Sequence, residues 1–231
     1  MTRHKRAKLL TAEERQALEA IYAFRRIVEL RLYPVNGNFD AAHLKEINRR
    51  IFQDLPFLGL DDVRPGEYRP AVAAGNDWMK TRRLETVAMP LNVAYSPMDD
   101  AAQTRLDAVL ATVCPDSLGK LNMDEFIQNL GALYAELDYL HPFRDGNSRT
   151  LREFTRQLAA ASGYVLDWER FGKSAAGRDI LYIARDLSVN ALALPHIQHA
   201  STRRAVLFSM DQFGANRTLP DLLRDAIRRA H

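Results

Sequence analysis

Two amphipathic segments of the chain are separated by a short polar stretch, His141-Pro142-Phe143-Arg144-Asp145-Gly146-Asn147-Ser148-Arg149-Thr150-Leu151-Arg152. Before it, apolar residues recur at helical spacing from Met123 to Leu140, behind the capping residue Asn122. After it, the helical spacing resumes at Leu151 and ends at Gly163, a residue type that suits a helix C-terminus. The polar stretch is therefore predicted to be a loop that joins two helices.

The rest of the chain is also predicted to be mostly helical. A capping box that begins at Thr11 opens an amphipathic segment, which Pro34 ends. Asp40 caps a second helix, which ends before Pro56. Further helices are expected from Asp99 onward and over Ser174–Val189, Pro195–Met210 and Pro220–Arg229.

Between residues 57 and 97 the helical spacing fails, because prolines and glycines interrupt the chain. Two short apolar runs, Leu84–Met89 and Leu91–Tyr95, flank Pro90 and are predicted to pair as strands. The expected fold class is therefore all-α with a small β-hairpin. No linker or internal repeat divides the chain, so one domain over residues 1–231 is expected.

Composition excludes several classes of protein. With 47% hydrophobic and 26% charged residues, the chain can bury enough apolar surface to fold. Its single cysteine, Cys114, excludes an internal disulfide framework and an all-cysteine zinc site. A net charge of +3 over 231 residues is weak support for nucleic-acid binding, which is not expected. No apolar run reaches the roughly 18 residues of a membrane span, and the basic N-terminus lacks the apolar core of a signal peptide.

The polar stretch combines groups that suit a phosphate ligand. Gly146 and Asn147 tolerate positive φ, so the backbone N–H groups of the loop can converge. The second helix then points its free N–H groups and positive dipole end at the same place. Arg149 and Arg152 are three residues apart and share one helix face, from which both guanidinium groups can reach phosphates.

Two further residues of the stretch suit chemistry on such a ligand. Asp145 is a hard oxygen ligand of the kind that holds Mg²⁺ against phosphates. His141 is a general base near neutral pH. Each residue alone also suits an ordinary structural role, but together the residues suit the binding of a phosphate ligand and a reaction on it. Phe143 is expected to pack inward as an anchor of the loop.

The stretch resembles the signature of the Fic domain family, His-Pro-Phe-x-[Asp/Glu]-Gly-Asn-[Gly/Lys]-Arg-x-x-Arg, at eleven of twelve positions. A weaker similarity extends over roughly residues 39–168. The resemblance implies the mostly helical Fic fold with a β-hairpin flap. It also implies a protein adenylyltransferase, an enzyme that transfers AMP from Mg²⁺-ATP to a Tyr, Thr or Ser hydroxyl of a target protein and releases pyrophosphate.

The resemblance implies a role for each matching residue. His141 corresponds to the base that deprotonates the target hydroxyl. Asp145 corresponds to the residue that holds Mg²⁺ between the α- and β-phosphates. Arg149 and Arg152 correspond to the two arginines that bind the β- and γ-phosphates, and Arg149 also neutralises charge on the departing pyrophosphate.

The anion hole of the family would be lined by Gly146, Asn147 and Ser148, with Asn147 also contributing its side chain. Ser148 is the one departure, because members that transfer AMP usually have Gly here and a phosphate-transferring branch has Lys. A serine keeps the backbone N–H and adds a hydroxyl that would either bond to a phosphate or crowd it. Transfer of phosphate or of another nucleotidyl group, and a catalytically silent interaction module, therefore stay open as alternatives.

In the family, the hairpin flap clamps a segment of the target by strand addition. The flap is expected within residues 75–97, where Trp78, Met79 and Met89 would be exposed apolar residues that dock the target.

Many family members carry an inhibitory helix with the pattern [Ser/Thr]-x-x-x-Glu-[Gly/Asn]. Here only Glu85 has a hydroxyl residue four positions before it, and neither Gly nor Asn follows it. Inhibition is therefore expected to come from a separate antitoxin-like protein. The resemblance places the chain in the bacterial cytoplasm, as a toxin, or in a host cell, as a secreted effector.

Overall fold

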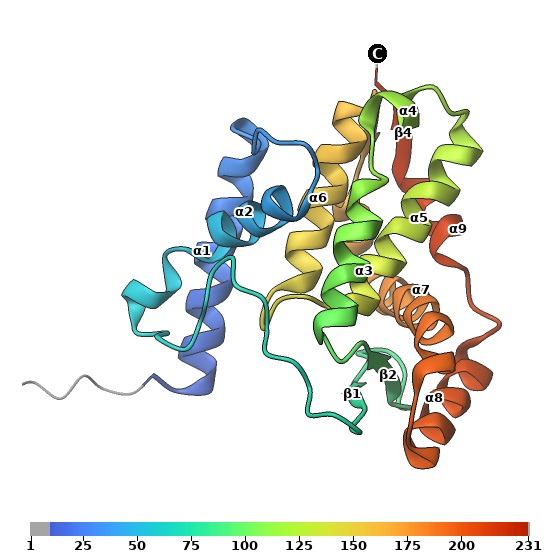
Figure 1. The fold of residues 1–231 in the computed structure, drawn as a ribbon. Coiled ribbons are helices and arrows are strands. Elements are labelled where there is room, and N and C mark those ends of the chain that lie inside the picture. The colour runs from blue at the N-terminus through green and yellow to red at the C-terminus, as the bar shows by residue number, and fades with distance from the viewer. Residues whose placement is uncertain (1–9, 231) are drawn as a thin grey trace, which may run out of the picture.

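The computed structural model of the chain describes residues 10–230, so residues 1–9, which include the basic N-terminus, and residue 231 lie outside it. The α-helices are α1 (Ala12–Leu32), α2 (Ala41–Phe52), α3 (Asp100–Ala111), α4 (Pro115–Gly119), α5 (Met123–Leu140), α6 (Asn147–Ala161), α7 (Ala175–Ala193), α8 (Ala200–Phe213) and α9 (Leu219–Ala226). Short 3₁₀ helices are η1 (Leu55–Leu58), η2 (Trp168–Lys173) and η3 (Leu194–His196), and the strands are β1 (Trp78–Arg82), β2 (Leu91–Tyr95), β3 (Tyr164–Leu166) and β4 (Ile227–Arg229). The expected fold class, all-α with a small β-hairpin, is confirmed (Figure 1).

Side-chain caps at the helix starts explain why several elements begin where the sequence predicts. The Thr11 hydroxyl accepts from the Glu14 N–H at 3.1 Å, and the Glu14 carboxylate accepts from the Thr11 N–H at 2.8 Å. Asn122 and Glu125 form the same reciprocal pair at the start of α5. Asp40 caps α2 by accepting from the third residue of that helix. These local bonds satisfy N–H groups that a helix start would leave free.

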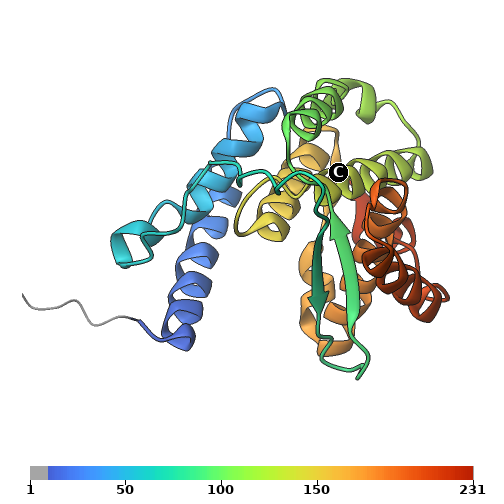
Figure 2. The same cartoon turned by 60° about the horizontal axis from the view of Figure 1, so that its bottom comes forward.

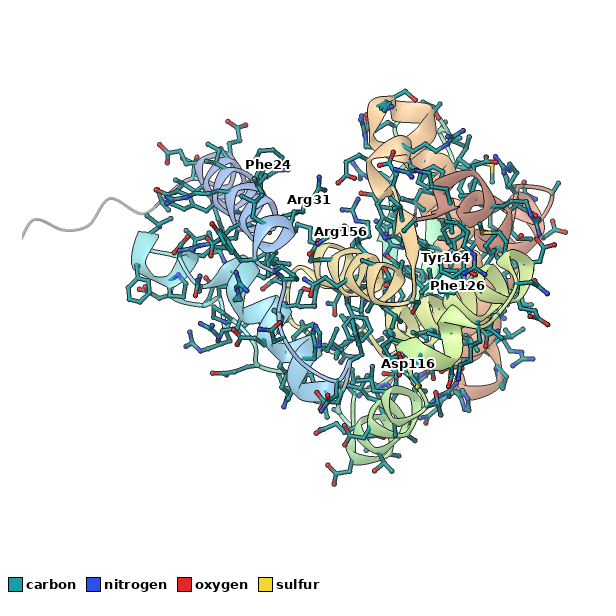
Figure 3. The ribbon with its side chains drawn as sticks, turned by 90° about the horizontal axis from the view of Figure 1, so that it is seen from above. Phe24, Arg31, Asp116, Phe126, Arg156 and Tyr164 are labelled. Carbon is teal, nitrogen blue, oxygen red and sulfur yellow. The ribbon has the colours of Figure 1, made fainter. Side chains whose placement is uncertain are left out.

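The polar loop is held by the buried helix α5, which contacts α3, α6, α7 and α9. The side chains of Phe126, Leu130, Tyr134 and Leu137 on α5 are at most 1% exposed. Burial of one such side chain contributes about 1.5–3 kcal/mol to folding. The Phe126 ring also stacks on Tyr164 of β3, with centroids 3.8 Å apart (Figure 3). Helix α5 is therefore packed on other elements from its first turn to its last, where the loop begins.

The β-hairpin pairs β1 with β2 in antiparallel register, from Trp78 opposite Tyr95 to Arg82 opposite Leu91. It lies against α7 and α8 through β2 (Figure 2). The expected strand Leu91–Tyr95 is confirmed.

The expected strand over Leu84–Met89 is wrong, since the first strand of the hairpin is β1. Leu84 is instead buried against Ile183 of α7 and Phe213 of α8. The Asp179 carboxylate on α7 accepts from the N–H groups of Glu85 and Thr86, at 3.0 and 2.6 Å. The apolar run therefore packs against a distant helix and has no strand partner.

The C-terminal third also departs from the prediction at two places. The helix expected over Pro195–Met210 begins only at Ala200, because Asp77 accepts from the N–H groups of Gln198 and His199, both at 2.9 Å. The helix expected over Pro220–Arg229 ends at Ala226. The chain then continues as β4, which pairs with β3. In residues 10–230, no helix is long and apolar enough to span a membrane.

Candidate active site

The loop begins at His141, which ends α5 with a left-handed backbone, φ 45° and ψ 57°. This conformation is uncommon for a residue with a side chain. The buried Arg69 side chain stabilises it, since its Nε donates to the His141 carbonyl at 2.8 Å and its Nη2 donates to the Ser96 carbonyl at 2.6 Å. Burial lowers the pKa of Arg69 to about 10. Arg69 therefore links the hairpin end to the loop, a role that the sequence prediction missed.

Inside the loop, the buried Asn147 side chain is hydrogen-bonded to the backbone of Phe143. Its Oδ1 accepts from the Phe143 N–H at 2.9 Å, and its Nδ2 donates to the Phe143 carbonyl at 2.6 Å. Phe143 is 1% exposed, as its predicted anchoring role requires. The Asn147 side chain therefore braces the loop through Oδ1 and one N–H of its amide. The expected contact of this side chain with an anion stays a prediction, since an amide nitrogen has a second N–H to donate. Its backbone N–H remains at the start of α6.

The start of α6 leaves N–H groups available to an anion. Gly146 has a positive φ of 73°, and the first bond of the helix runs from the Thr150 N–H to the Gly146 carbonyl at 3.0 Å. The N–H groups of Asn147, Ser148 and Arg149 therefore have no acceptor within the helix. This is the geometry of an anion site at a helix N-terminus.

Gly146 is required here for two reasons, and both are testable. A Cβ at this position would overlap the Phe52 ring, and the residue would also need its left-handed backbone. We expect Gly146→Ala to lower the free energy of unfolding by about 1–2 kcal/mol for the backbone and by about 1–3 kcal/mol more for the overlap. Gly59 is a matched control, because its φ is 84° and nothing lies within 4 Å of an added Cβ. Urea unfolding of both variants measures the difference, and equal losses would contradict the argument.

The two arginines nearest the start of α6, Arg149 and Arg152, have different surroundings. Arg149 forms an ion pair with Glu19 of α1, and its guanidinium lies 4.8 Å from the centre of the Phe52 ring. The Arg152 Nε donates to the Ser148 carbonyl at 3.2 Å, and burial lowers the Arg152 pKa. Among residues 10–230, Arg152 has no carboxylate partner, so its terminal nitrogens are available to a ligand.

Asp145 is exposed on the loop between the two helices. Residues 10–230 contain no cluster of three or more His, Cys, Asp or Glu side chains that could hold a metal ion. A single carboxylate such as Asp145 suits Mg²⁺, because Mg²⁺ is commonly held by one or two carboxylates together with substrate phosphates and water. It suits a metal that is bound by protein side chains alone less well.

The His141 side chain is buried among groups from α5 and the hairpin. Its ring centroid lies 4.1 Å from that of Tyr95 and 5.2 Å from that of Trp78. The Lys80 Nζ lies 3.3 Å from the His141 Nε2. Burial lowers the pKa of His141 to about 4, although Asp138 acts in the opposite direction. The imidazole is therefore neutral at pH 7 and able to accept a proton.

The three apolar residues that were expected to be exposed on the hairpin differ in their exposure. Met79 is 37% exposed, as predicted. Trp78 is only half-buried, because it packs on His141 and Tyr95, and Arg69 lies 3.8 Å from its ring centre. Met89 packs in the small cluster around Leu84. Of the three, only Met79 is therefore exposed as predicted.

Behind His141 lies a buried charged group that the sequence prediction missed. The Arg185 guanidinium of α7 donates to Asp138 Oδ2 from Nη2 at 2.8 Å and from Nε at 3.2 Å. Its Nη1 donates to the Ser148 hydroxyl at 3.0 Å. The serine that departs from the expected pattern is therefore bonded to a guanidinium from α7. The only local signal was Asp138 itself, an acidic residue three positions before His141 on an apolar helix.

Known proteins resemble this chain in sequence over the same region. The Fic/DOC family model matches residues 38–159. The protein adenylyltransferase VbhT of Bartonella schoenbuchensis is 32% identical over 156 residues, which cover 67% of this chain and 28% of the relative. A protein adenylyltransferase of Bartonella henselae is 29% identical over 150 residues, 64% of this chain and 26% of the relative. The chain thus spans about a quarter of the length of these relatives.

Solved structures share the fold. The BepC protein of Bartonella tribocorum, with bound AMPPNP, matches with a TM-score of 0.64 and 18% identity, over 96% of this chain and 90% of that one. The N-terminal Fic domain of a Bartonella quintana effector, with bound ADP, matches with a TM-score of 0.62 and 20% identity, over 98% and 94%. The family model covers more than half of the described chain and includes the whole polar loop. The chain therefore belongs to the Fic/DOC family.

Proposed function

We propose that this chain is a protein adenylyltransferase, which transfers AMP from Mg²⁺-ATP to a Tyr, Thr or Ser hydroxyl of a target protein. The observation that carries the proposal is the polar loop, which joins a buried neutral His141 to the open start of α6, where Arg149 and Arg152 lie. The curated relatives named protein adenylyltransferase support the reaction. The structural neighbours with bound AMPPNP and ADP support the nucleotide.

In the proposed reaction, the His141 Nε2 takes the proton of the target hydroxyl, and the hydroxyl oxygen attacks the α-phosphorus of ATP. The bond between the α-phosphorus and the bridging oxygen breaks, and pyrophosphate leaves. Arg149, Arg152 and the N–H groups at the start of α6 stabilise the negative charge that develops. Asp145 would hold Mg²⁺, which neutralises charge on the phosphates when it is bound. The protein thus contributes positioning and electrostatics.

We propose that the target docks on the hairpin along β1. The outer edge of β2 is closed, because the Asn92 N–H donates to the Ser209 hydroxyl at 2.9 Å and the Ala94 N–H donates to the Asn190 side chain at 3.1 Å. The sheet contains only β1 and β2, so the outer edge of β1 is open within the described chain. An extended target segment added there would lie beside Lys80 and close to His141.

The reaction is tested with ATP labelled at either the α- or the γ-phosphate, incubated with the chain, Mg²⁺ and a cell lysate. Protein labelled from the α-phosphate alone is the expected result. Label from the γ-phosphate alone would show phosphotransfer instead. No label in any lysate, including those of eukaryotic cells, would favour a catalytically silent interaction module.

The Glu19–Arg149 ion pair predicts an effect on nucleotide binding. Glu19 must release Arg149 before its guanidinium binds phosphates, and both side chains are about a quarter exposed. A pair of this exposure contributes about 0.2–1 kcal/mol, so Glu19→Gln should lower the KM for ATP by up to about fivefold. Glu46→Gln is the control, because Glu46 pairs with Arg49 on the surface of α2. An unchanged KM in Glu19→Gln would contradict the competition.

We also propose that strong inhibition comes from a separate antitoxin-like protein. The one Glu with a hydroxyl residue four positions before it, Glu85, lies in the hairpin connection and pairs with Arg178 of α7. It is therefore engaged away from Arg152. Activation of the purified chain by far more than fivefold in Glu19→Gln would show that the chain inhibits itself and would overturn this proposal.

The location is also proposed from the comparisons. The BepC and Bartonella quintana neighbours are described as effectors that are translocated by Bartonella. This supports a bacterial protein that acts in the bacterial cytoplasm or, after secretion, in a host cell. Immunodetection in bacterial and host-cell fractions distinguishes the two locations.

A further inference from the structure

The two ring nitrogens of His141 face groups of opposite charge. On one side, the Asp138 Oδ1 lies 3.6 Å from Nδ1. On the other side, the Lys80 Nζ lies 3.3 Å from Nε2. Both Oδ1 of Asp138 and Nδ1 of His141 are buried and lack another hydrogen-bond partner in the described chain. These two atoms face each other across this distance, so a shift of a few tenths of an ångström closes the bond.

This arrangement selects one tautomer of the imidazole. A carboxylate only accepts a hydrogen bond, and an ammonium group only donates one. Nδ1 facing Asp138 must therefore carry the proton, and Nε2 facing Lys80 must present its lone pair. That is the tautomer in which Nε2 takes a proton from a hydroxyl group.

Arg185 keeps the carboxylate charged and in place. The Asp138 side chain is fully buried, and that of Arg185 is 2% exposed. Burial would raise the pKa of Asp138, but Arg185 and His141 outweigh it and hold that pKa well below its usual range. Because Arg185 also donates to the Ser148 hydroxyl, one guanidinium joins the support of the base to the start of α6.

We propose that Asp138 is a positioning residue for His141, which fixes the tautomer and the ring orientation of the base, and that Arg185 aligns Asp138 with Ser148. This inference rests on the proposed function for the role of His141 as the base. A carboxylate that orients a histidine and stabilises its protonated form has a large effect on proton transfer in other enzymes. Asp138 itself touches no substrate in this scheme.

The other charged and titratable groups around His141 act against its protonation or are neutral. Lys80 on β1 and Arg69 in the preceding segment both disfavour the imidazolium, as does burial. Tyr95 on β2 stays protonated, since burial raises its pKa. Asp138 is therefore the group that stabilises the imidazolium formed during the reaction. Its loss should move the acid limb of the kcat–pH profile to lower pH.

Asp138→Asn tests the proposal. We expect kcat to fall about 100-fold, the lower end of what a general base contributes. The KM for ATP should change by less than about twofold, because Asp138 bonds to Arg185 and to neither Arg149 nor Arg152. The matched control is Glu153→Gln, which also removes a buried carboxylate paired with an arginine, Arg156, but does not contact His141. Its kcat should stay within about twofold of the parent value.

Loss of stability is separated from loss of positioning by a second variant. Asp138→Asn leaves Arg185 buried without its carboxylate, which is destabilising. In the double variant Asp138→Asn/Arg185→Gln the buried charge is gone, so the melting temperature should recover while kcat stays low. Recovery of kcat together with the melting temperature would overturn the proposal and make the pair purely structural.

A readout without turnover separates this inference from the proposed function. The ¹⁵N chemical shifts of the His141 ring report which nitrogen carries the proton at pH 7. We expect Nδ1–H in the parent chain and a mixture of tautomers in Asp138→Asn. Identical shifts in both proteins would overturn the positioning role. If the parent chain transferred no AMP but showed the expected shifts, the proposed function would fail and the tautomer assignment would stand.

Discussion

Replacing His141 by alanine is expected to reduce AMP transfer by about 10²–10⁴-fold, the range that a general base contributes. The affinity for ATP should change by less than about twofold, because the phosphates are expected at the start of α6 and not at the imidazole. Initial rates with labelled ATP measure the first effect, and calorimetric titration of ATP measures the second. Unaltered transfer would remove His141 as the base.

The same experiment needs a variant that keeps the local backbone. His141 has a left-handed conformation with φ 45°, which alanine tolerates poorly and asparagine tolerates better. His141→Asn should therefore melt closer to the parent chain than His141→Ala does. Both variants should lose transfer to the same extent, since neither has a base. A large residual rate in His141→Asn alone would mean that the alanine variant fails through its backbone.

Replacing Arg152 by alanine is expected to reduce kcat by about 10²–10³-fold, the effect of removing one group that stabilises developing negative charge. The structure supports this because, among residues 10–230, the Arg152 guanidinium is hydrogen-bonded through its Nε alone, to the Ser148 carbonyl. Arg152→Lys keeps the charge but loses the paired N–H groups, so its loss should be intermediate. Steady-state kinetics in ATP separates the effects on kcat and KM. A kcat within twofold of the parent value in Arg152→Ala would contradict the role.

The parts of the fold that could be predicted are those with local causes. The capping boxes at Thr11 and Asn122 each connect residues three positions apart, so the sequence shows both partners at once. The polar loop could also be predicted, because its residues act within one helix–loop–helix unit. Leu84 could not be placed, since its partners lie on α7 and α8. The three-residue strand β4 is too short to show a spacing pattern, and it pairs with β3 far away in the sequence.

In the candidate site, too, residues that act within one stretch of sequence could be predicted, and residues whose partners are distant in the sequence could not. His141, Asp145 and Arg152 were named from one continuous stretch. Arg69 and Arg185 were missed, because they contact this stretch only after the chain has folded back over many residues. Asn147 was named, but its side chain bonds to Phe143 and braces the loop. Its residue type suggested a ligand contact, and only the geometry shows that the amide also holds the loop backbone.

The structure shows the hydrogen-bond partner of the Ser148 hydroxyl. The sequence left open whether its hydroxyl bonds to a phosphate or crowds it. In the structure the hydroxyl accepts from Arg185, a residue of α7 that also holds Asp138. The side chain is therefore turned toward the support of the base, and the Ser148 N–H remains at the start of α6. The serine that departs from the family pattern therefore has a buried hydrogen-bond partner, Arg185.

In the proposed reaction, this chain joins AMP to a protein hydroxyl and releases pyrophosphate, with His141 as the base. The most direct test uses a target protein that accepts label from ATP. Both products, AMP bound to this protein and free pyrophosphate, are quantified in the same reaction. The parent chain should form the two in equal amounts, and His141→Asn should form neither at a comparable rate. Protein-bound phosphate with ADP as the second product, or equal yields from the His141→Asn variant, would contradict the claim.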